Sequence, residues 1–551
     1  MATLQFKLII EGMTCTDCEN HIVKALSELG AVRPSADFRR NEAVFTAPSE
    51  LSLDRLFKAV RDAGYVPVGV ELREERCVEP PQSQVREYDY DLLIIGSGAA
   101  AFSAAIEAVK FDARIAIIER STVGGTCVNV GCVPSKTMLR AGEIYHQAGS
   151  HPFAGIHTSV RSVDLSALID QKDALVQELR KHKYEDLIDA YGFKLLHGEA
   201  RFADGHTVIV NEQRITAAKF LIATGASPEI PDIEGLTDVS YLTSTSALDL
   251  RAVPDHLIVI GSGFIALEMG QFFRDAGARV TLIQRSERLL PSHEPEISDA
   301  VRQFLQSQGI DVICSATYER ISEVDGIKSV HLVVQGEARV IRGDALLVAA
   351  GRAPNTAGLD LEKANVRIGE KGQVLVVDGM RTSNPDVYAA GDVTLGPQFV
   401  YVAAHQGAIA ASNAVGKEGR KVDLRAVPSV IFTHPAIASV GMTEEKAKAH
   451  GHDTRVSVVP LDAVPRALAN HDTTGVLKLV ADAKTRKILG VHVVAENAGD
   501  VIYSGVLAIK FGLTIDDIAG TLAPYLTMAE GLKLAALTFD RDVSTLSCCA
   551  G

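Results

Sequence analysis

The sequence has no tryptophan and no apolar run near the roughly 20 residues that a membrane-spanning helix requires. Its start, MATLQFKLIIEGMTC, lacks the charged beginning, long apolar core and small-residue cleavage site of a secretory signal. Eight cysteines in a chain of 551 residues are too few for a disulfide framework. Without an export signal, we expect a cytoplasmic protein with reduced thiols and no membrane insertion.

Basic residues are also in deficit, with 55 Lys and Arg against 69 Asp and Glu, giving a net charge of −14. This balance argues against nucleic acid as a partner. The chain is too long for one core, so we expect three or four domains. Its 45 glycines and many Ala, Val and Ile runs favour an α/β fold with buried parallel strands.

Most of the cysteines lie in close pairs. The pairs are Cys15 with Cys18, Cys127 with Cys132, and Cys548 with Cys549. A redox centre needs one dithiol, so three pairs suggest that the thiols also bind a soft metal ion. Cys77 and Cys314 are isolated and are interpreted as ordinary residues.

Changes in hydrophobic periodicity and composition divide the chain into segments. Alternation over residues 4–10 predicts a strand and periodicity over 18–29 a helix, within a unit of residues 1–70. Residues 71–87 are charged and contain proline, which is typical of a linker. From about residue 428 an α+β region begins, with strand-like VLKLVAD and ILGVHVVA and helical stretches after Gly499.

Two βαβ units open with glycine motifs, GSGAAA and GSGFIA, each directly after an apolar strand. Each motif offers a turn glycine, a glycine that lets the backbone approach a pyrophosphate, and a small residue for helix–strand packing. These positions are Gly96, Gly98 and Ala101 in the first unit, and Gly261, Gly263 and Ala266 in the second. Two such copies predict two dinucleotide sites.

The ends of the second strands distinguish the two cofactors. Glu119 is placed to bind the diol of an adenosine ribose in the first unit. The second unit has Gln284 at that place, with Arg285 and Arg288 close behind, and arginine favours the 2′-phosphate of NADP(H). Alternatively, the two arginines form a solvated surface.

The central cysteines lie in GGTCVNVGCVPSK, residues 124–136. Two cysteines five apart at a helix start can approach disulfide distance, and a helix N-terminus lowers a thiol pKa. A structural disulfide is the alternative, which the cytoplasmic setting and the adjacent nucleotide site disfavour.

The chain resembles the flavin-dependent pyridine nucleotide–disulfide oxidoreductases over about residues 88–540. The motifs that carry the resemblance are GSGAAA, GGTCVNVGCVPSK, LIATGASP, GSGFIALE, AAGRAPNT and YAAGDVT. The resemblance implies FAD in the first site and NADPH in the second. The implied segments are 88–230 and 356–427 for FAD, 231–355 for NADPH, and 428–551 for dimerisation. The expected fold is therefore α/β, with two Rossmann-like domains and an α+β dimerisation domain.

The resemblance also implies site roles. Cys132 would face the flavin as a charge-transfer thiolate, Cys127 would exchange with substrate, and Lys136 would lie beside the flavin ring paired with Glu268. Further implied FAD contacts are Gly125, Thr126, Ala200, Thr224, Gly225, Asp392 and Val400. Further implied NADPH contacts are Phe264, Ile265 and Gly351.

One departure from the disulfide reductases lies in APYLTMAEG, residues 523–531. In those enzymes the histidine of a His-Pro pair, together with a glutamate, supplies the general acid/base for thiol exchange. Here Tyr525 stands in place of the histidine, and Glu530 remains. A phenol with a pKa of about 10 is a poor proton shuttle near neutrality. Disulfide reduction is therefore disfavoured.

The segment GMTCTDC, residues 12–18, resembles the heavy-metal-associated domain, a βαββαβ ferredoxin-like fold with its cysteine pair on the first loop. Two thiolates at this spacing suit a soft ion; a thioredoxin-type motif and half of a zinc site are alternatives. Cys548 and Cys549 could chelate, relay electrons to another dithiol, or be incidental to a tail.

Together these features resemble the mercuric ion reductases, one group within that family. The resemblance implies mercury resistance through NADPH-driven reduction of Hg(II), delivered as a thiolate complex, to Hg(0). Tyr184 would be a second active-site tyrosine, although a packed or surface position is an alternative. In this scheme Cys15 and Cys18 collect the ion after transfer from a membrane transporter. Cys548 and Cys549 of the partner in a homodimer then receive it.

Two competing functions remain open at this stage. One is a low-molecular-weight disulfide reductase with a metal-binding appendage, against which Tyr525 argues. The other is a metal chaperone or storage protein, which would suit residues 1–70 alone and leave the flavoenzyme motifs unexplained.

Overall fold

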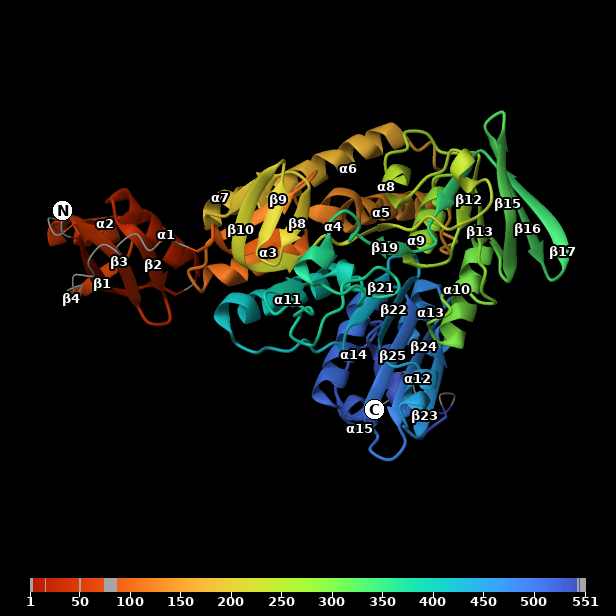
Figure 1. Ribbon diagram of the computed structural model, residues 1–551. Helices are drawn as coiled ribbons and strands as arrows, with labels where there is room; N and C mark the ends of the chain where they lie inside the picture. Colours follow the sequence, from red (N-terminus) through yellow and green to blue (C-terminus); the bar gives the residue numbers. More distant parts are fainter. Residues whose placement is uncertain (1–2, 15, 49–50, 74–86, 543–544, 546–551) are drawn as a thin grey trace. The chain divides into compact units, whose positions relative to one another are not determined.

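The computed structural model describes residues 3–14, 16–48, 51–73, 87–542 and 545 (Figure 1). The predictions for Cys15, Cys77, Cys548 and Cys549 lie outside these residues. The chain forms two compact units, Met1–Glu87 and Tyr88–Gly551. Among the described helices, none is both long and apolar enough to cross a membrane.

The N-terminal unit has the element order βαββαβ, as the sequence predicts. Its elements are β1 (Thr3–Glu11), α1 (Thr16–Glu28), β2 (Val32–Asp37), β3 (Glu42–Pro48), α2 (Leu53–Asp62) and β4 (Val66–Arg73). The antiparallel sheet has the order β2-β3-β1-β4. Alternate residues of β1, Phe6, Leu8 and Ile10, are buried in the same core as Ile22 and Leu26 of α1.

Two boundaries in this unit differ from prediction. Strand β4 continues to Arg73 because residues 66–73 pair with β1, so residues 71–73 are strand rather than linker. Cys18 lies in the first turn of helix α1, which agrees with the helix predicted over residues 18–29 and differs from the loop position that the resemblance implies.

The first nucleotide-binding motif joins β5 (Tyr90–Ile95), α3 (Ala99–Val109) and β6 (Ile115–Glu119). The sheet order is β7-β6-β5-β10-β9-β8, and a further short strand pairs with β10. The remaining strands are β7 (Lys194–His197), β8 (Ala200–Asp204), β9 (Thr207–Val210), β10 (Gln213–Ile222) and β20 (Val387–Ala389). Because β20 pairs in parallel with β10, two distant stretches of sequence build one sheet.

Helices follow this first βαβ unit and carry the central cysteines. They are α4 (Gly125–Val130), α5 (Cys132–Gly149), α6 (Leu165–Arg180), the π-helix η1 (Lys181–Glu185) and α7 (Asp186–Tyr191). Cys132 is the first residue of α5, which confirms the predicted helix start. On the sheet, α11 (Val400–Ala411) packs across α3 so closely that a Cβ on Gly407 would lie 2.1 Å from the Ala100 carbonyl oxygen.

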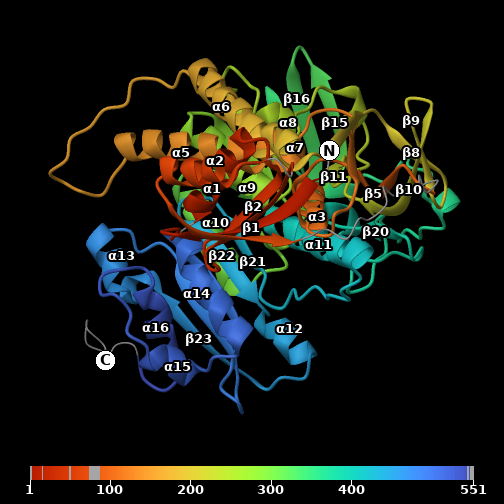
Figure 2. The same cartoon turned by 90° about the vertical axis from the view of Figure 1, so that its left-hand side faces the viewer.

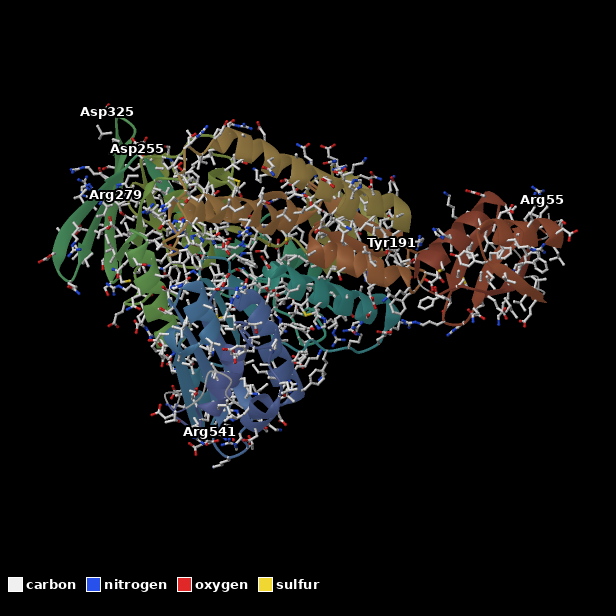
Figure 3. The ribbon with its side chains drawn as sticks, turned by 180° about the vertical axis from the view of Figure 1, so that it is seen from behind. Arg55, Tyr191, Asp255, Arg279, Asp325 and Arg541 are labelled. Carbon is white, nitrogen blue, oxygen red and sulfur yellow. The ribbon has the colours of Figure 1, made fainter. Side chains whose placement is uncertain are left out.

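The second motif builds a four-stranded parallel sheet of order β14-β13-β12-β18. Its elements are β12 (His256–Ile260), α9 (Phe264–Asp275), β13 (Arg279–Ile283), α10 (Pro295–Ser307), β14 (Asp311–Ile313) and β18 (Ala345–Val348). An antiparallel sheet of β15 (Ala316–Val324), β16 (Ile327–Val334) and β17 (Glu337–Gly343) stands beside it (Figure 1). Figure 3 shows Asp325 at the tip of this sheet, with Asp255 and Arg279 nearer the parallel strands.

The C-terminal region contains a five-stranded antiparallel sheet of order β21-β22-β25-β24-β23. Its strands are β21 (Pro428–Ile431), β22 (Ala436–Gly441), β23 (Thr454–Pro460), β24 (Val476–Asp482) and β25 (Ile488–Ala495). Strands β24 and β25 coincide with the two predicted from VLKLVAD and ILGVHVVA. Helices α14 (Ala498–Phe511) and α16 (Glu530–Leu537) pack against this sheet (Figure 2).

Candidate active site

The turn glycines after β5 and β12 cannot carry a side chain. Gly96 has φ +104°, and an added Cβ would lie 2.4 Å from the carbonyl oxygen of Ala223. Gly261 has φ +115°, and its Cβ would lie 2.3 Å from the carbonyl oxygen of Ala349. Each turn therefore places a second glycine, Gly98 or Gly263, at the N-terminus of a helix.

Two cavities are lined by residues of the first glycine turn, and together they suit an elongated dinucleotide. The smaller, of about 240 Å³, is lined by the predicted residues Gly96, Glu119, Ala200 and Thr224. The Glu119 carboxylate is held by Ser97 Oγ at 2.6 Å and by the Ser121 amide at 2.8 Å. This buried carboxylate suits the ribose of FAD.

The larger cavity has a volume of about 560 Å³. It brings together Gly98, Thr126, Cys127, Cys132, Lys136, Gly225, Glu268, Asp392 and Val400 from the predicted set. Gln398 also lines it, and its Nε2 is buried without a hydrogen-bond partner among the described residues. Such an orphaned donor fits a polar ring system bound in this cavity.

The two central cysteines have opposite electrostatic environments. The Cys127 thiol is hydrogen-bonded to Cys132, and this bond, with the nearby Lys136 ammonium, lowers the pKa of Cys132 to about 7 despite burial. The same hydrogen bond and burial raise the pKa of Cys127 well above the ordinary thiol range. Near neutral pH the pair is therefore poised as one thiolate and one thiol.

Lys136 is fixed by its neighbours. Its Nζ lies 2.8 Å from Glu268 Oε2, the pairing that the resemblance implies, and 4.8 Å from the ring centroid of Phe432. Glu268 in turn accepts a hydrogen bond of 2.9 Å from the Phe432 amide. The ammonium therefore remains close to the thiolate.

Replacing Lys136 with methionine should raise the pKa of Cys132, because an ammonium that favours the thiolate is removed. The thiolate fraction at pH 7 should fall several-fold, while Lys136→Arg, which keeps the charge, should retain most of it. The rate of alkylation by iodoacetamide as a function of pH measures the change. An unaltered midpoint in the methionine variant would contradict the role of Lys136.

Tyr184 lies beside the cysteines. It sits in π-helix η1, a local widening of the helix often found at functional sites, and packs edge-on against Phe102 at 4.9 Å. Burial raises the pKa of Tyr184, and the neighbouring Cys127 and Cys132 raise it further. A neutral phenol therefore lies close enough to both thiols to interact with them electrostatically, although Tyr184 is not among the residues that line the cysteine cavity.

Tyr525 and Glu530 are placed differently. Tyr525 is 49% exposed and is absent from the residues that line the cysteine cavity within one chain. Glu530 begins helix α16, is buried, and has a pKa raised by that burial. A single chain thus does not place these two predicted residues at the cysteines.

The sequence reasoning missed several residues of this cavity: Arg352, Tyr401, Phe432 and Tyr503. Arg352 and Tyr401 directly follow the predicted Gly351 and Val400. Burial raises the pKa of Tyr401 to about 12, and Cys132 contributes to that rise. Phe432 and Tyr503 come from the C-terminal region and carried no motif signal.

The second glycine turn opens into a cavity of about 1270 Å³. It is lined by Gly261, Gly263, Phe264, Ile265, Arg285 and Gly351 from the predicted set. Ser262 also lines it, and its Oγ is buried without a partner among the described residues. The cavity fits a second dinucleotide, with Arg285 available for a 2′-phosphate, whereas Arg288 lies outside the lining.

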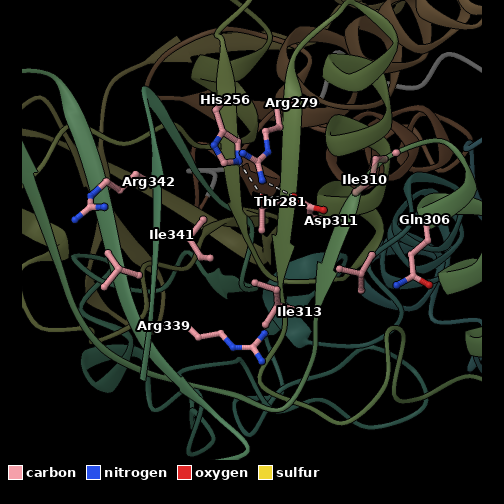
Figure 4. A pocket seen from close by; sticks show the side chains of 13 residues that line it. His256, Arg279, Thr281, Gln306, Ile310, Asp311, Ile313, Arg339, Ile341 and Arg342 are labelled. Atoms are coloured by element: carbon pink, nitrogen blue, oxygen red, sulfur yellow. Dashed lines mark hydrogen bonds and ion pairs between the residues drawn. The ribbon is translucent and has the colours of Figure 1, made fainter. Parts of the chain in front are cut away.

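Another cavity, of about 650 Å³, lies between the parallel sheet of the second βαβ unit and strand β17 (Figure 4). His256 and Arg279 are the first residues of β12 and β13, and His256 Nε2 lies 2.9 Å from Thr281 Oγ1. Dinucleotides bind at the carboxyl ends of parallel strands, whereas this cavity is lined by the first residues of β12 and β13, by all of β14 and by residues 339–342 of β17, and it shares no lining residue with the second dinucleotide cavity. It is therefore separate from both cofactor sites.

Replacing Arg285 with alanine should raise KM for NADPH by about 10- to 100-fold, because charge-assisted hydrogen bonds to the phosphate are lost. KM for NADH should barely change. Arg288→Ala is the matched control and should have a smaller effect, since Arg288 lies outside the cavity lining. Equal losses with both nucleotides would contradict phosphate recognition by Arg285.

The family comparisons agree with this geometry. The sequence model of the pyridine nucleotide-disulphide oxidoreductases matches residues 90–407, and that of their dimerisation domain matches 427–536. A mercuric reductase of Staphylococcus aureus is 56% identical over 557 residues, covering 100% of both chains. One from Bacillus cereus is 56% identical over 99% of this chain and 87% of its own. The chain belongs to the mercuric reductase family.

Structural similarity extends beyond the family's mercuric reductases. The Cu(II) complex of the HOCl-induced flavoprotein disulfide reductase RclA from Escherichia coli matches with a TM-score of 0.74 and 32% identity. The match covers 82% of this chain and 99% of that protein. FAD and NADPH are the cofactors of the family, and the two glycine-turn sites are where they fit.

Proposed function

We propose that this protein reduces Hg(II) to Hg(0) with electrons from NADPH and so confers mercury resistance. The observation that carries the proposal is the Cys127–Cys132 pair, in which a thiolate and a thiol share the cavity that suits the flavin. Two sulfur ligands suit a soft ion in a near-linear complex. Membership of the mercuric reductase family supports the same substrate.

In this mechanism, Cys127, the exchanging thiol, loses its proton and captures Hg(II) from an incoming thiolate complex, and the Cys132 thiolate then displaces the remaining ligand. Each exchange replaces one Hg–S bond with another, so no free ion is released. FAD, when bound, would supply two-electron transfer between NADPH and the metal. Overall, NADPH and a bis-thiolate complex of Hg(II) give Hg(0), NADP⁺, a proton and the two released thiolates. Tyr184, uncharged beside the pair, would orient the metal complex.

The proposed roles of Tyr525 and of the C-terminal cysteine tail depend on a dimer. Tyr503, Phe511 and Leu522 of the C-terminal region are 64%, 68% and 92% exposed, which is consistent with an interface between two copies. In such a homodimer the partner would supply Tyr525, Glu530 and the Cys548–Cys549 pair to the cavity. The tail would receive Hg(II) before Cys127 and Cys132 do.

The N-terminal unit is proposed to be a heavy-metal-associated domain of the ferredoxin-like type. Its βαββαβ order and the position of Cys18 in the first turn of α1 support this assignment. Cys15 and Cys18 would collect Hg(II), including ion handed over by a membrane transporter. The FAD segments 88–230 and 356–427, the NADPH segment 231–355 and the dimerisation segment 428–551 complete the proposed division.

The test is NADPH oxidation by the purified flavin-loaded protein with Hg(II) or glutathione disulfide as acceptor. Rapid oxidation with Hg(II), accompanied by volatile mercury, is expected, whereas glutathione disulfide should support little turnover. The reverse pattern would identify a disulfide reductase and overturn the proposal.

Replacing both Cys548 and Cys549 with alanine should abolish turnover of Hg(II) presented in complexes with bulky thiols. Small Hg(II) complexes, which can reach the central pair directly, should still be reduced. Steady-state assays with the two forms of substrate make the comparison. Full activity toward the bulky complex would contradict a relay through the tail.

A further inference from the structure

A second group of potential metal ligands lies away from the paired cysteines. His146 comes from α5, Asp275 is the last residue of α9, and His434 lies between β21 and β22. His146 Nδ1 is 3.3 Å from Asp275 Oδ1, and His434 Nε2 is 3.2 Å from Asp275 Oδ2. One ligand atom from each residue lies within 4.8 Å of the other two.

This group is buried but poorly satisfied. The Asp275 side chain is only 2% exposed, yet neither of its oxygens has a hydrogen bond of acceptable geometry with a described residue. His434 Nε2 is likewise buried and without such a bond. A buried carboxylate is costly unless it is fully paired or binds a metal. The two rings therefore lie near the carboxylate without the alignment of an ordinary hydrogen-bonded pair.

The backbone of His434 is held in place by its neighbours. The side chain of Gln271, also on α9, accepts a hydrogen bond from the His434 amide at 2.8 Å and donates one of 2.9 Å to its carbonyl oxygen. Gln308 donates a second bond, also 2.9 Å, to the same carbonyl. These contacts fix the position of the imidazole relative to Asp275.

The ligand chemistry selects a class of ion. In a tetrahedral Zn(II) site, metal–ligand bonds of about 2.0–2.1 Å place neighbouring ligand atoms roughly 3.3 Å apart. The two separations, each to a different oxygen of Asp275, are close to that spacing, and one ligand atom from each of the three residues lies within 4.8 Å of the others. Imidazole and carboxylate suit a borderline ion such as Zn(II), whereas Hg(II) prefers thiolates.

We propose that His146, Asp275 and His434 bind one divalent transition-metal ion, with Zn(II) as the best-matched species, at a site distinct from the thiol pairs. Water would fill the fourth position. The ion would join three elements around the active cavity. Helix α5 starts at Cys132, α9 carries Glu268 that pairs with Lys136, and the His434 segment follows Phe432. Its role would be to stabilise this scaffold.

The experiment uses the full-length flavin-loaded chain in which the six paired cysteines are replaced by serine, so that thiolates do not compete. Zinc chloride is titrated by calorimetry, and thermal unfolding is followed with and without it. One ion per chain and a raised Tm are expected. X-ray absorption should show nitrogen and oxygen ligands at about 2.0–2.1 Å and no sulfur.

Variants separate a binding site from a buried ion pair. The His146 side chain is 29% exposed, so His146→Gln should be tolerated by the fold. This variant should weaken Zn(II) affinity at least 10- to 100-fold, since even the loss of a residue that only hydrogen-bonds a metal ligand has an effect of that size. His157→Gln, at an exposed position, is the matched control and should bind as tightly as its parent. No binding in the parent, or unchanged affinity in His146→Gln, would overturn the proposal. The outcome does not depend on activity toward Hg(II).

Discussion

Replacing Cys132 with serine should reduce Hg(II)-dependent NADPH oxidation by at least about a thousandfold, because a hard, protonated hydroxyl cannot substitute for a soft thiolate. Cys132 has a pKa of about 7, so its thiolate is substantially formed at neutral pH. Alkylation by iodoacetamide should rise with pH through a midpoint near 7 in the parent, and this transition should be absent from Cys132→Ser. Volatile mercury and NADPH absorbance report the loss of turnover.

Variants of Cys127 and Cys314 test whether the effect is specific to Cys132. Cys127→Ala removes the hydrogen bond that contributes most to the low pKa, so the Cys132 midpoint should move upward. Cys314→Ser is the control, since this isolated cysteine follows strand β14 and burial raises its pKa. Turnover in Cys132→Ser comparable to that of the Cys314→Ser control would contradict the requirement for the Cys132 thiolate.

Replacing Gly96 with alanine should abolish FAD binding by destabilising the fold. The residue has φ +104°, and its new Cβ would lie 2.4 Å from the Ala223 carbonyl oxygen. Left-handed strain and the forced backbone shift together cost about 2–4 kcal/mol. We expect a lowered Tm in the apoprotein and a flavin-to-protein absorbance ratio near zero.

Gly98→Ala provides the matched comparison two residues later. Gly98 has φ −80°, and an added Cβ meets only the Gly125 Cα at 3.9 Å, which is ordinary contact. This variant should therefore fold with nearly normal apoprotein stability but bind FAD weakly, because its methyl group occupies space near the pyrophosphate. Equal destabilisation of both apoproteins would contradict these separate roles for the two glycines.

The parts of the site that were predictable depend on short-range geometry. Gly96 and Gly261 follow directly after apolar strands, and the turn itself demands their positive φ. Cys132 could be placed at a helix start from its local sequence. These constraints involve neighbours in the chain, which a sequence displays.

The remaining parts depend on contacts between distant segments. Phe432 reaches Lys136 only because strand β21 of the C-terminal sheet lies beside α9. Strand pairing with β1, rather than composition, carries β4 through residues 71–73. Tyr525 was predicted at the metal, yet it is absent from the cavity lining of a single chain, and its role depends on the proposed partner.

The pairing of β20 with β10 also has a consequence for the order in which a new chain can fold. Val387 pairs with Phe220, and α11 then covers α3 through Gly407. During synthesis the strands and helix of the second βαβ unit emerge before β20, so that unit can close while the first sheet still lacks a strand. The first sheet, and with it the flavin site, can therefore be completed only after β20 has been synthesised, when most of the polypeptide has left the ribosome.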